Sequence, residues 1–143
     1  MRFTGRTATA IIVYPGDKIL LIKRRTPPFI GYWALPGGRS EPDETVEQTV
    51  IREAKEETGL VVEIMRKVGE YHEQGVQGDI KYDYYPACFL VKPVGGEVDK
   101  QESEISEIKL FNLDTLPGVM AFVHAQMIRD FLVQKTSQNE SLL

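Results

Sequence analysis

The sequence predicts an α/β fold in which a mixed β-sheet is flanked by helices on two faces. Strand-like segments lie on both sides of a central helix-like segment, and a second helix-like segment lies near the C-terminus. Elements of this kind each have an apolar side, and they bury it by packing in layers. A chain of 143 residues is long enough for one domain with its own core. No linker is visible, so we expect a single domain over residues 1–143.

The first expected elements are strands, predicted from their apolar and β-branched composition. Residues 7–14 are rich in Ala, Thr, Ile and Val, and residues 18–24 read KILLIKR. Pro15-Gly16-Asp17 between them has the composition of a turn, so the two segments are expected to form a hairpin. Residues 31–35 are expected as a short strand that ends at a Pro-Gly-Gly sequence.

The central helix is expected to begin between residues 43 and 45 and to end near Thr58. Thr45 with Gln48 fits a capping box, and so does Ser40 with Asp43, which leaves two starts open. Gly59 is expected just after the helix, where glycine commonly adopts the left-handed conformation. The side that packs on the sheet is expected to consist of Val46, Val50, Ile51 and Ala54.

Three more strands and a second helix are expected after Gly59. Residues 61–71 and 80–91 are predicted as long strands, with residues 73–79 connecting them and Gly95-Gly96 forming a turn. Residues 105–111 alternate between apolar and polar, as a half-buried strand does.

The C-terminal part of the chain is expected to be helical. Residues 112–117 are predicted to contain a short helical turn. Residues 119–134 form an amphipathic pattern, with Met120, Val123, Met127 and Phe131 recurring at helical spacing. Residues 136–141 are polar and are expected to fray.

Charge and cysteine content exclude several classes of function. The net charge is −4 and the isoelectric point is near 5.3, so no general attraction to a nucleic-acid polymer is expected. The only cysteine, Cys88, lies in an apolar run and is expected to be buried filler. The first residues lack the apolar segment of a signal peptide, and no segment resembles a membrane span. We therefore expect a cytoplasmic protein without a membrane partner.

Residues 38–60, GRSEPDETVEQTVIREAKEETGL, carry the chemistry. Glu53, Glu56 and Glu57 stand at positions i, i+3 and i+4 of the expected helix, so they project from one face. Three neighbouring carboxylates repel one another unless a cation lies between them. Mg²⁺ prefers oxygen ligands and is commonly held by one or two carboxylates together with substrate phosphates. The spacing therefore predicts metal-assisted chemistry on a phosphorylated substrate.

The same stretch resembles the signature of the Nudix (MutT-like) hydrolases, G-x5-E-x7-R-E-U-x-E-E-x-G-U, in which U is aliphatic. The flanking WALPGG sequence is also similar to that family. The resemblance implies a Nudix-type α/β/α sandwich and an enzyme that hydrolyses phosphoanhydride bonds. Ala54 is smaller than the usual residue at its position, which affects packing more than chemistry. The matching positions are Gly38, Glu44, Arg52, Glu53, Ala54, Glu56, Glu57, Gly59 and Leu60.

The resemblance also implies a metal site. Glu56 and Glu57 are the main ligands, Glu53 is a ligand or a base, and the Gly38 carbonyl joins the metal shell. Mg²⁺ is the expected ion, and Mn²⁺ is the alternative. Bound metal would neutralise phosphate charge and lower the pKa of a bound water molecule.

Further catalytic roles are implied for residues around these ligands. Arg52 is expected to orient a glutamate through a bidentate pair. Glu44 either supports the loop or contacts the outer metal shell, and we favour support. Many family members supply another glutamate from a later loop. The sequence QESEISE offers Glu102, Glu104 and Glu107, of which we choose Glu104.

Residues before the signature are candidates for substrate binding. Arg25 could contact phosphates, and Tyr32 and Trp33, with Phe29, could stack on a base. A surface role for Arg25 and core packing for Trp33 and Phe29 remain open alternatives. His124 is expected to be structural.

The substrate class is inferred from the resemblance alone. The chain is most similar to short microbial ADP-ribose pyrophosphatases, so we expect cleavage of a nucleoside diphosphate linked to another moiety, with ADP-ribose first. Gly75 stands where many ADP-ribose hydrolases have proline. The alternative is a nucleoside-triphosphate pyrophosphohydrolase of the sanitising type, and a third hypothesis is an idle nucleotide-binding module. A homodimer is expected by analogy.

Overall fold

An eight-stranded mixed sheet forms the centre of the computed structural model, which describes residues 2–138. The main path of the sheet runs β3-β2-β1-β7-β5, with β4 paired to β1, β6 to β7 and β8 to β2. The β1–β7 pair is parallel and the other pairs are antiparallel. The elements are β1 (Arg2–Tyr14), β2 (Lys18–Arg24), β3 (Trp33–Ala34), β4 (Gly37–Arg39), α1 (Val46–Thr58), β5 (Leu60–Glu70), β6 (Glu73–Gln77), β7 (Ile80–Gly96), β8 (Ile105–Asn112) and α2 (His124–Gln138).

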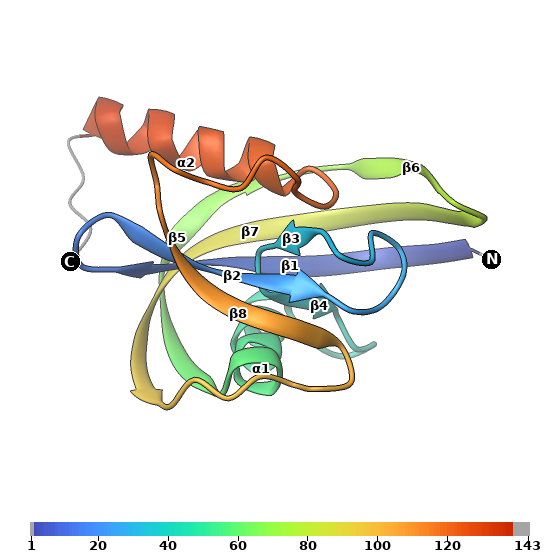
Figure 1. Ribbon diagram of the computed structural model, residues 1–143, viewed down its shortest axis with the longest axis horizontal. Coiled ribbons are helices and arrows are strands. Elements are labelled where there is room, and N and C mark those ends of the chain that lie inside the picture. The colour runs from blue at the N-terminus through green and yellow to red at the C-terminus, as the bar shows by residue number, and fades with distance from the viewer. Residues whose placement is uncertain (1, 139–143) are drawn as a thin grey trace.

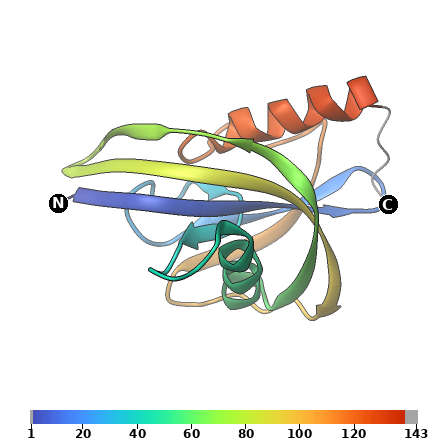
Figure 2. The same ribbon diagram turned by 180° about the vertical axis from the view of Figure 1, so that it is seen from behind.

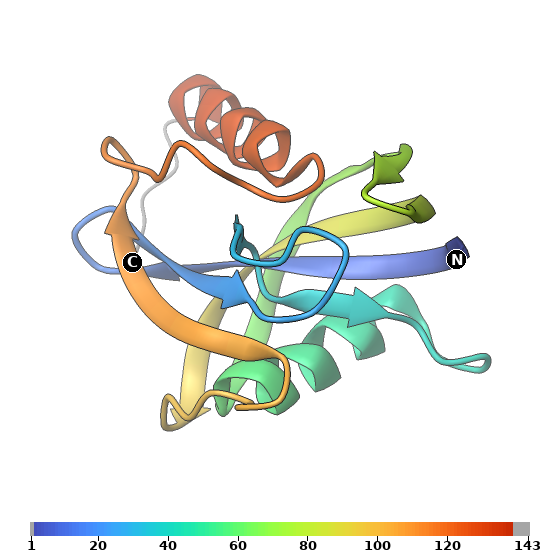
Figure 3. The same cartoon turned by 45° about the vertical axis from the view of Figure 1, so that its right-hand side comes forward.

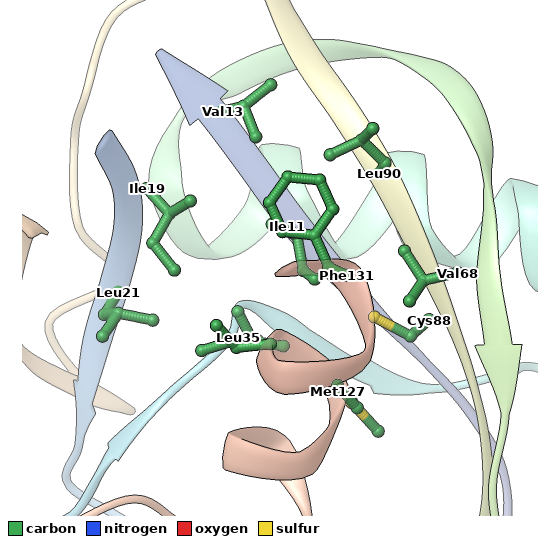
Figure 4. Close-up of a cluster of buried hydrophobic side chains, with 11 residues drawn as sticks. Ile11, Val13, Ile19, Leu21, Leu35, Val68, Cys88, Leu90, Met127 and Phe131 are labelled. Carbon is green, nitrogen blue, oxygen red and sulfur yellow. The ribbon is translucent and has the colours of Figure 1, made fainter. Parts of the chain in front are cut away.

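The helices lie on opposite faces of the sheet, α2 on one and α1 on the other, as Figures 1 and 2 show from two sides. Alternation along β1 produces both interfaces, because successive strand residues point to opposite faces. Ala8, Ala10 and Ile12 pack with Val50 and Ala54 of α1. Ile11 and Val13 belong to a second buried cluster that includes Met127 and Phe131 of α2 (Figure 4). The predicted α/β fold with helices on both faces of a mixed sheet is therefore confirmed.

Several strands are longer than the sequence predicted. β1 begins at Arg2, because residues 2–6 pair in parallel with residues 81–85 of β7. The prediction of a turn at Gly95-Gly96 is wrong, since both glycines lie in β7 and pair with Val61 and Leu60. The expected connection at residues 73–79 is also wrong in part. Glu73–Gln77 forms β6, a hairpin partner of β7 that closes at Gly78, which has φ 65°.

The boundaries of α1 follow local capping chemistry. The Thr45 hydroxyl accepts a hydrogen bond from the Gln48 N–H, and the Gln48 side-chain oxygen accepts one from the Thr45 N–H, so this is the capping box that forms. Gly59 ends the helix with φ 81°, as predicted. Ile51 was wrongly assigned to the packed side, because its side chain is 40 % exposed. Thr49 is the buried residue on that part of the helix.

The second helix begins at His124, five residues later than predicted. Trp33 explains the delay, because its N–H donates to the Val119 carbonyl and its carbonyl accepts from the Ala121 N–H. Residues in such a bridge cannot also be helical. Residues 112–117 contain a hydrogen-bonded turn instead of the predicted helical turn.

The remaining C-terminal predictions are tested only in part. The helix includes Thr136, where fraying was expected, and residues 139–141 lie outside the described residues. No helix within residues 2–138 is both long enough and apolar enough to cross a membrane.

Candidate active site

Strand β4 runs beside α1, which carries Glu57 (Figure 3). The Gly37 N–H donates a hydrogen bond of 2.8 Å to Glu57 Oε1. Glu57 is only 6 % exposed, although α1 is otherwise a polar helix on its outer side. Strand β4 therefore fixes one carboxylate oxygen of the signature in the protein interior.

The backbone of β4 passes close to two other groups. A Cβ atom on Gly38 would overlap the carboxyl group of Glu53, and a Cβ atom on Gly37 would overlap the Ala8 carbonyl. The Pro-Gly-Gly sequence thus brings the backbone of residue 38 directly against a candidate metal ligand.

Arg52 connects three carboxylates of the signature. Its Nε and Nη2 atoms donate to the two oxygens of Glu44 at 2.6 and 2.9 Å. Its Nη1 atom donates to Glu53 at 3.0 Å and to Glu56 at 3.1 Å. The bidentate partner is therefore Glu44, and the arginine also orients Glu53 and Glu56.

Glu44 supports the loop before α1, as the sequence favoured. Its Oε1 atom accepts hydrogen bonds from the Glu41 N–H at 3.0 Å and from the Thr49 hydroxyl at 2.8 Å. The hydrogen bonds from Arg52 are the main reason that the pKa of Glu44 falls to about 2. Glu44 therefore carries a negative charge at neutral pH and holds Arg52 in place.

The neighbouring carboxylates experience the opposite effect. Burial is the main cause that raises the pKa of Glu53 to about 7, and the negative charges of Glu56 and Glu104 add to it. Burial likewise raises the pKa of Glu57 well above its ordinary value, and Glu53 and Glu104 add to that shift. These carboxylates lie close enough together to repel one another when ionised. A bound cation would stabilise their ionised form.

The loop before β8 brings Glu104 to this cluster. The N–H groups of Asp99 and Gln101 donate to the carbonyls of Thr58 and Glu57, so the loop covers the C-terminal end of α1. Glu104 lines the pocket beside these carboxylates. Glu102, the other candidate, has a side chain that is 72 % exposed and pairs with Lys100.

The carboxylates lie along one wall of a pocket of about 630 Å³. This volume is typical of a site for a small molecule. Glu53, Glu57 and Glu104 line it, together with Gly38 and Arg52. Another part of its lining consists of Arg24, Glu73, Tyr84, Phe122 and His124.

Arg24 is a pocket residue that the sequence interpretation missed. Its Nε atom donates to the Pro28 carbonyl at 2.8 Å, and its guanidinium group lies 5.1 Å from the Phe122 ring centre. Ile22 also lines the pocket, and Arg24 stands two residues later on the same strand. Strand residues two positions apart share a face of the sheet, so Arg24 lies on the same face as Ile22 and Arg25 does not. This alternation could have favoured Arg24 over Arg25 as the phosphate-binding residue.

The structure does not bring the three predicted substrate-binding residues into the pocket lining. Arg25 is exposed, and its side chain donates to the Glu102 carbonyl. Trp33 packs edge-to-face against Phe111 at 4.9 Å, and Tyr32 packs against Phe29 at 5.1 Å. Glu56 also lies outside the lining and remains partly exposed beside Arg52.

The donor set is suited to a hard divalent cation. Within residues 2–138, no three His, Cys, Asp or Glu side chains already stand together as a ligand set. Glu53 and Glu56 instead point toward Arg52. Carboxylate oxygens next to the exposed backbone of Gly38 are nevertheless the donors that Mg²⁺ and Mn²⁺ prefer.

Comparison with known proteins identifies the family. The family profile described as the NUDIX domain matches residues 4–131. The chain belongs to the Nudix hydrolase family. It is therefore an enzyme of a family whose members generally use divalent metal cations. It is 40 % identical over 121 residues to an ADP-ribose pyrophosphatase of Methanocaldococcus jannaschii, which covers 85 % of this chain and 69 % of the relative.

Other relatives and solved Nudix structures agree with the fold. A Bacillus subtilis protein provisionally named 8-oxo-dGTP diphosphatase is 31 % identical, over 87 % of this chain and 77 % of the relative. A MutT Nudix hydrolase from Burkholderia pseudomallei superposes with a TM-score of 0.78 at 27 % identity, covering 89 % of this chain and 97 % of that chain. The Nudix domain of Shewanella oneidensis NrtR, solved with ADP ribose, has a TM-score of 0.72 at 25 % identity, covering 94 % and 90 %.

Proposed function

We propose that this Nudix hydrolase cleaves the phosphoanhydride bond of a nucleoside diphosphate linked to another moiety, with ADP-ribose as the first substrate. One observation carries the proposal. The carboxylates of Glu53, Glu57 and Glu104 line the same pocket as the guanidinium group of Arg24, and Glu57 among them is buried. A diphosphate needs both, because its charge must be neutralised by metal ions and cationic side chains before water can attack.

Mg²⁺ is the proposed ion, and Mn²⁺ remains the alternative. The proposed ligands are Glu53, Glu56, Glu57 and the Gly38 carbonyl. When bound, the ion supplies charge neutralisation and lowers the pKa of a coordinated water molecule.

The catalytic set comprises Glu53, Glu56, Arg52 and Glu104. Arg52 keeps Glu53 and Glu56 oriented toward the ligand positions, and it is itself held by Glu44. Glu104 is available to accept a proton at the pocket wall. Its position beside Glu53 and Glu57 supports this choice over Glu102.

The pocket lining changes which residues are proposed to bind the substrate. The pocket lining favours Arg24 for the phosphates, in place of Arg25. For the aromatic contact, the lining favours Phe122 and Tyr84 over Tyr32 and Trp33. Substituting Arg24 should raise the KM for ADP-ribose more than substituting Arg25.

A nucleoside-triphosphate pyrophosphohydrolase is the second candidate. The 31 % identical relative from Bacillus subtilis favours it. The metal chemistry would be the same, but the products would be a nucleoside monophosphate and pyrophosphate. An idle nucleotide-binding module is disfavoured because every glutamate of the signature is present.

A substrate panel with Mg²⁺, read out by product identity, tests the proposal. ADP-ribose should yield AMP and ribose 5-phosphate, and omitting the metal should abolish the reaction. Formation of pyrophosphate from nucleoside triphosphates, with ADP-ribose left intact, would establish the second candidate instead. No product from any nucleotide with Mg²⁺ or Mn²⁺ would refute both.

Three broader expectations remain proposals. The chain is proposed to form one domain over residues 1–143 and to assemble as a homodimer, which light scattering would test. The proposed compartment is the cytoplasm, which cell fractionation would test. The proposed partners are small nucleotides, without a nucleic-acid polymer or a membrane.

A further inference from the structure

We propose that Glu73 and His124 together recognise the part of the substrate beyond the diphosphate, each through a hydrogen bond to that moiety. The pair would accept one hydrogen bond and donate another to adjacent polar groups of that moiety. This inference rests on the proposed function, because it assigns specificity within the same pocket. It adds two residues that the Nudix signature does not contain.

Glu73 is a buried carboxylate with one free oxygen. It stands at the start of β6, is 4 % exposed and lines the pocket. Its Oε2 atom accepts a hydrogen bond of 3.2 Å from the Val123 N–H. Its Oε1 atom has no hydrogen-bond partner within residues 2–138 and is not sealed from the pocket. Because this oxygen is accessible and has no partner in the described part of the chain, it is available to a hydrogen-bond donor of a ligand.

His124 supplies the matching donor. It is 4 % exposed and also lines the pocket. Its Nδ1 atom accepts a hydrogen bond of 3.0 Å from the Leu35 N–H, which assigns the ring proton to Nε2. Burial is the main cause that lowers the pKa of His124 to about 3, so the ring stays neutral. Nε2 has no hydrogen-bond partner in the described part of the chain.

Phe122 and Arg24 place this pair next to the proposed diphosphate site. The Phe122 ring lies 5.4 Å from the His124 ring and 5.1 Å from the Arg24 guanidinium carbon. Arg24 interacts electrostatically with Glu57 of the metal cluster and also with Glu73. A substrate whose phosphates contact Arg24 therefore brings its adjoining moiety toward Glu73 and His124.

Glu73 bonds to the residue before His124 and both line the pocket, so an acceptor and a donor face the same ligand. Each hydroxyl of a vicinal ribose diol can both donate and accept a hydrogen bond. The edge of adenine also offers a donor, its amino group, next to a ring-nitrogen acceptor. ADP-ribose contains both the ribose diol and the adenine edge. Each offers a neighbouring donor and acceptor, so the experiment must distinguish the sugar from the base. A moiety lacking one of the two groups would leave a polar atom of the pocket unpaired and would bind more weakly.

Calorimetric binding without divalent metal tests the pair, because no hydrolysis then occurs. At pH 8, ADP-ribose should bind at least tenfold more weakly to Glu73→Gln than to the wild-type protein. The amide can still accept from Val123 but presents a donor where Oε1 was. His124→Asn should weaken binding similarly, since asparagine can accept from Leu35 but lacks Nε2. Glu70→Gln is the matched control, because its side chain is exposed and pairs with Lys67 alone among residues 2–138.

Two analogues identify the source of the contacts. Weaker wild-type binding of the hypoxanthine analogue of ADP-ribose indicates the base edge, and weaker binding of an analogue with 2-deoxyribose as the terminal sugar indicates the diol. In either case Glu73→Gln should lose the discrimination. Equal binding of ADP-ribose to the wild-type protein and Glu73→Gln overturns the proposal, provided that thermal melting shows both are folded. Equal wild-type binding of all three compounds overturns it as well.

Failure of the proposed function gives a different result. If the wild-type protein does not bind ADP-ribose at all, the substrate assignment is refuted. The same variants are then titrated with the nucleotide that the substrate panel identifies. Unchanged affinity for that nucleotide in Glu73→Gln refutes the pair independently.

Discussion

Replacing Glu73 by glutamine should alter how stability depends on pH. Burial raises the pKa of Glu73 from 4.5 to about 7 in the folded protein. The folded state therefore holds this proton more tightly than the unfolded chain, so stability falls as pH rises from 4.5 to 7 and then levels off. A shift of this size corresponds to about 3 kcal/mol at 1.36 kcal/mol per unit. Glutamine cannot ionise and avoids that loss.

The measurement is urea unfolding at pH 5, 6, 7 and 8, followed by circular dichroism and extrapolated to water. Glu73→Gln should gain about 2–3 kcal/mol relative to the wild-type protein between pH 5 and pH 8. Glu53 and Glu57 titrate in both proteins, so their contributions cancel in the difference. Glu70→Gln, which removes an exposed carboxylate, is measured alongside as the control for the substitution itself. A flat difference for Glu73→Gln would refute the reasoning that burial of its charge is costly.

Three further predictions concern the metal-binding region. Glu56→Gln and Glu57→Gln should each lower the kcat for ADP-ribose by orders of magnitude while melting stays cooperative, because charge is lost and volume is kept; near-normal turnover in both would contradict the metal assignment. Gly38→Ala should lower kcat/KM about a hundredfold, because the added methyl group displaces the Glu53 carboxylate; unchanged kinetics in a folded variant would show that Glu53 can move without consequence. Arg52→Lys should lower the free energy of unfolding in urea by about 1–2 kcal/mol and should weaken Mg²⁺ binding in calorimetry. The reason is that lysine cannot pair bidentately with Glu44 and also reach Glu53 and Glu56. Wild-type values for both measurements would refute a positioning role for Arg52.

The parts of the site that were predictable depend on local chemistry. The Thr45 cap, the helix ending at Gly59 and the shared face of Glu53 and Glu57 all follow from spacing within one turn or two. Support of the loop by Glu44 was favoured because Glu44 lies near the start of the helix; its pairing with Arg52 is a finding of the structure. These features need only helix geometry, which the sequence pattern specifies.

The parts that were missed depend on contacts between distant segments. β6 is polar and contains a glycine, so only its pairing with β7 makes it a strand. Glu73 consequently reaches the pocket through a hairpin that the sequence did not predict. The late start of α2 has the same origin, because Trp33 occupies the backbone of residues 119–121. Tertiary pairing overrode local propensity in each case.

The carboxylates with raised pKa values point to one explanation for their burial. Glu53, Glu57 and Glu73 all line the same pocket, and burial is the first cause of the shift for each. Glutamine at these positions would keep the volume and avoid the cost of an ionised, buried group. Ionising buried carboxylates lowers the stability of the folded protein. Such a cost is expected to be concentrated in one pocket when ligand binding requires the carboxylates there. A cation would compensate for Glu53 and Glu57, whereas Glu73 has Arg24 nearby and a free oxygen, so a hydrogen-bond donor of the substrate suits it better than a metal ion.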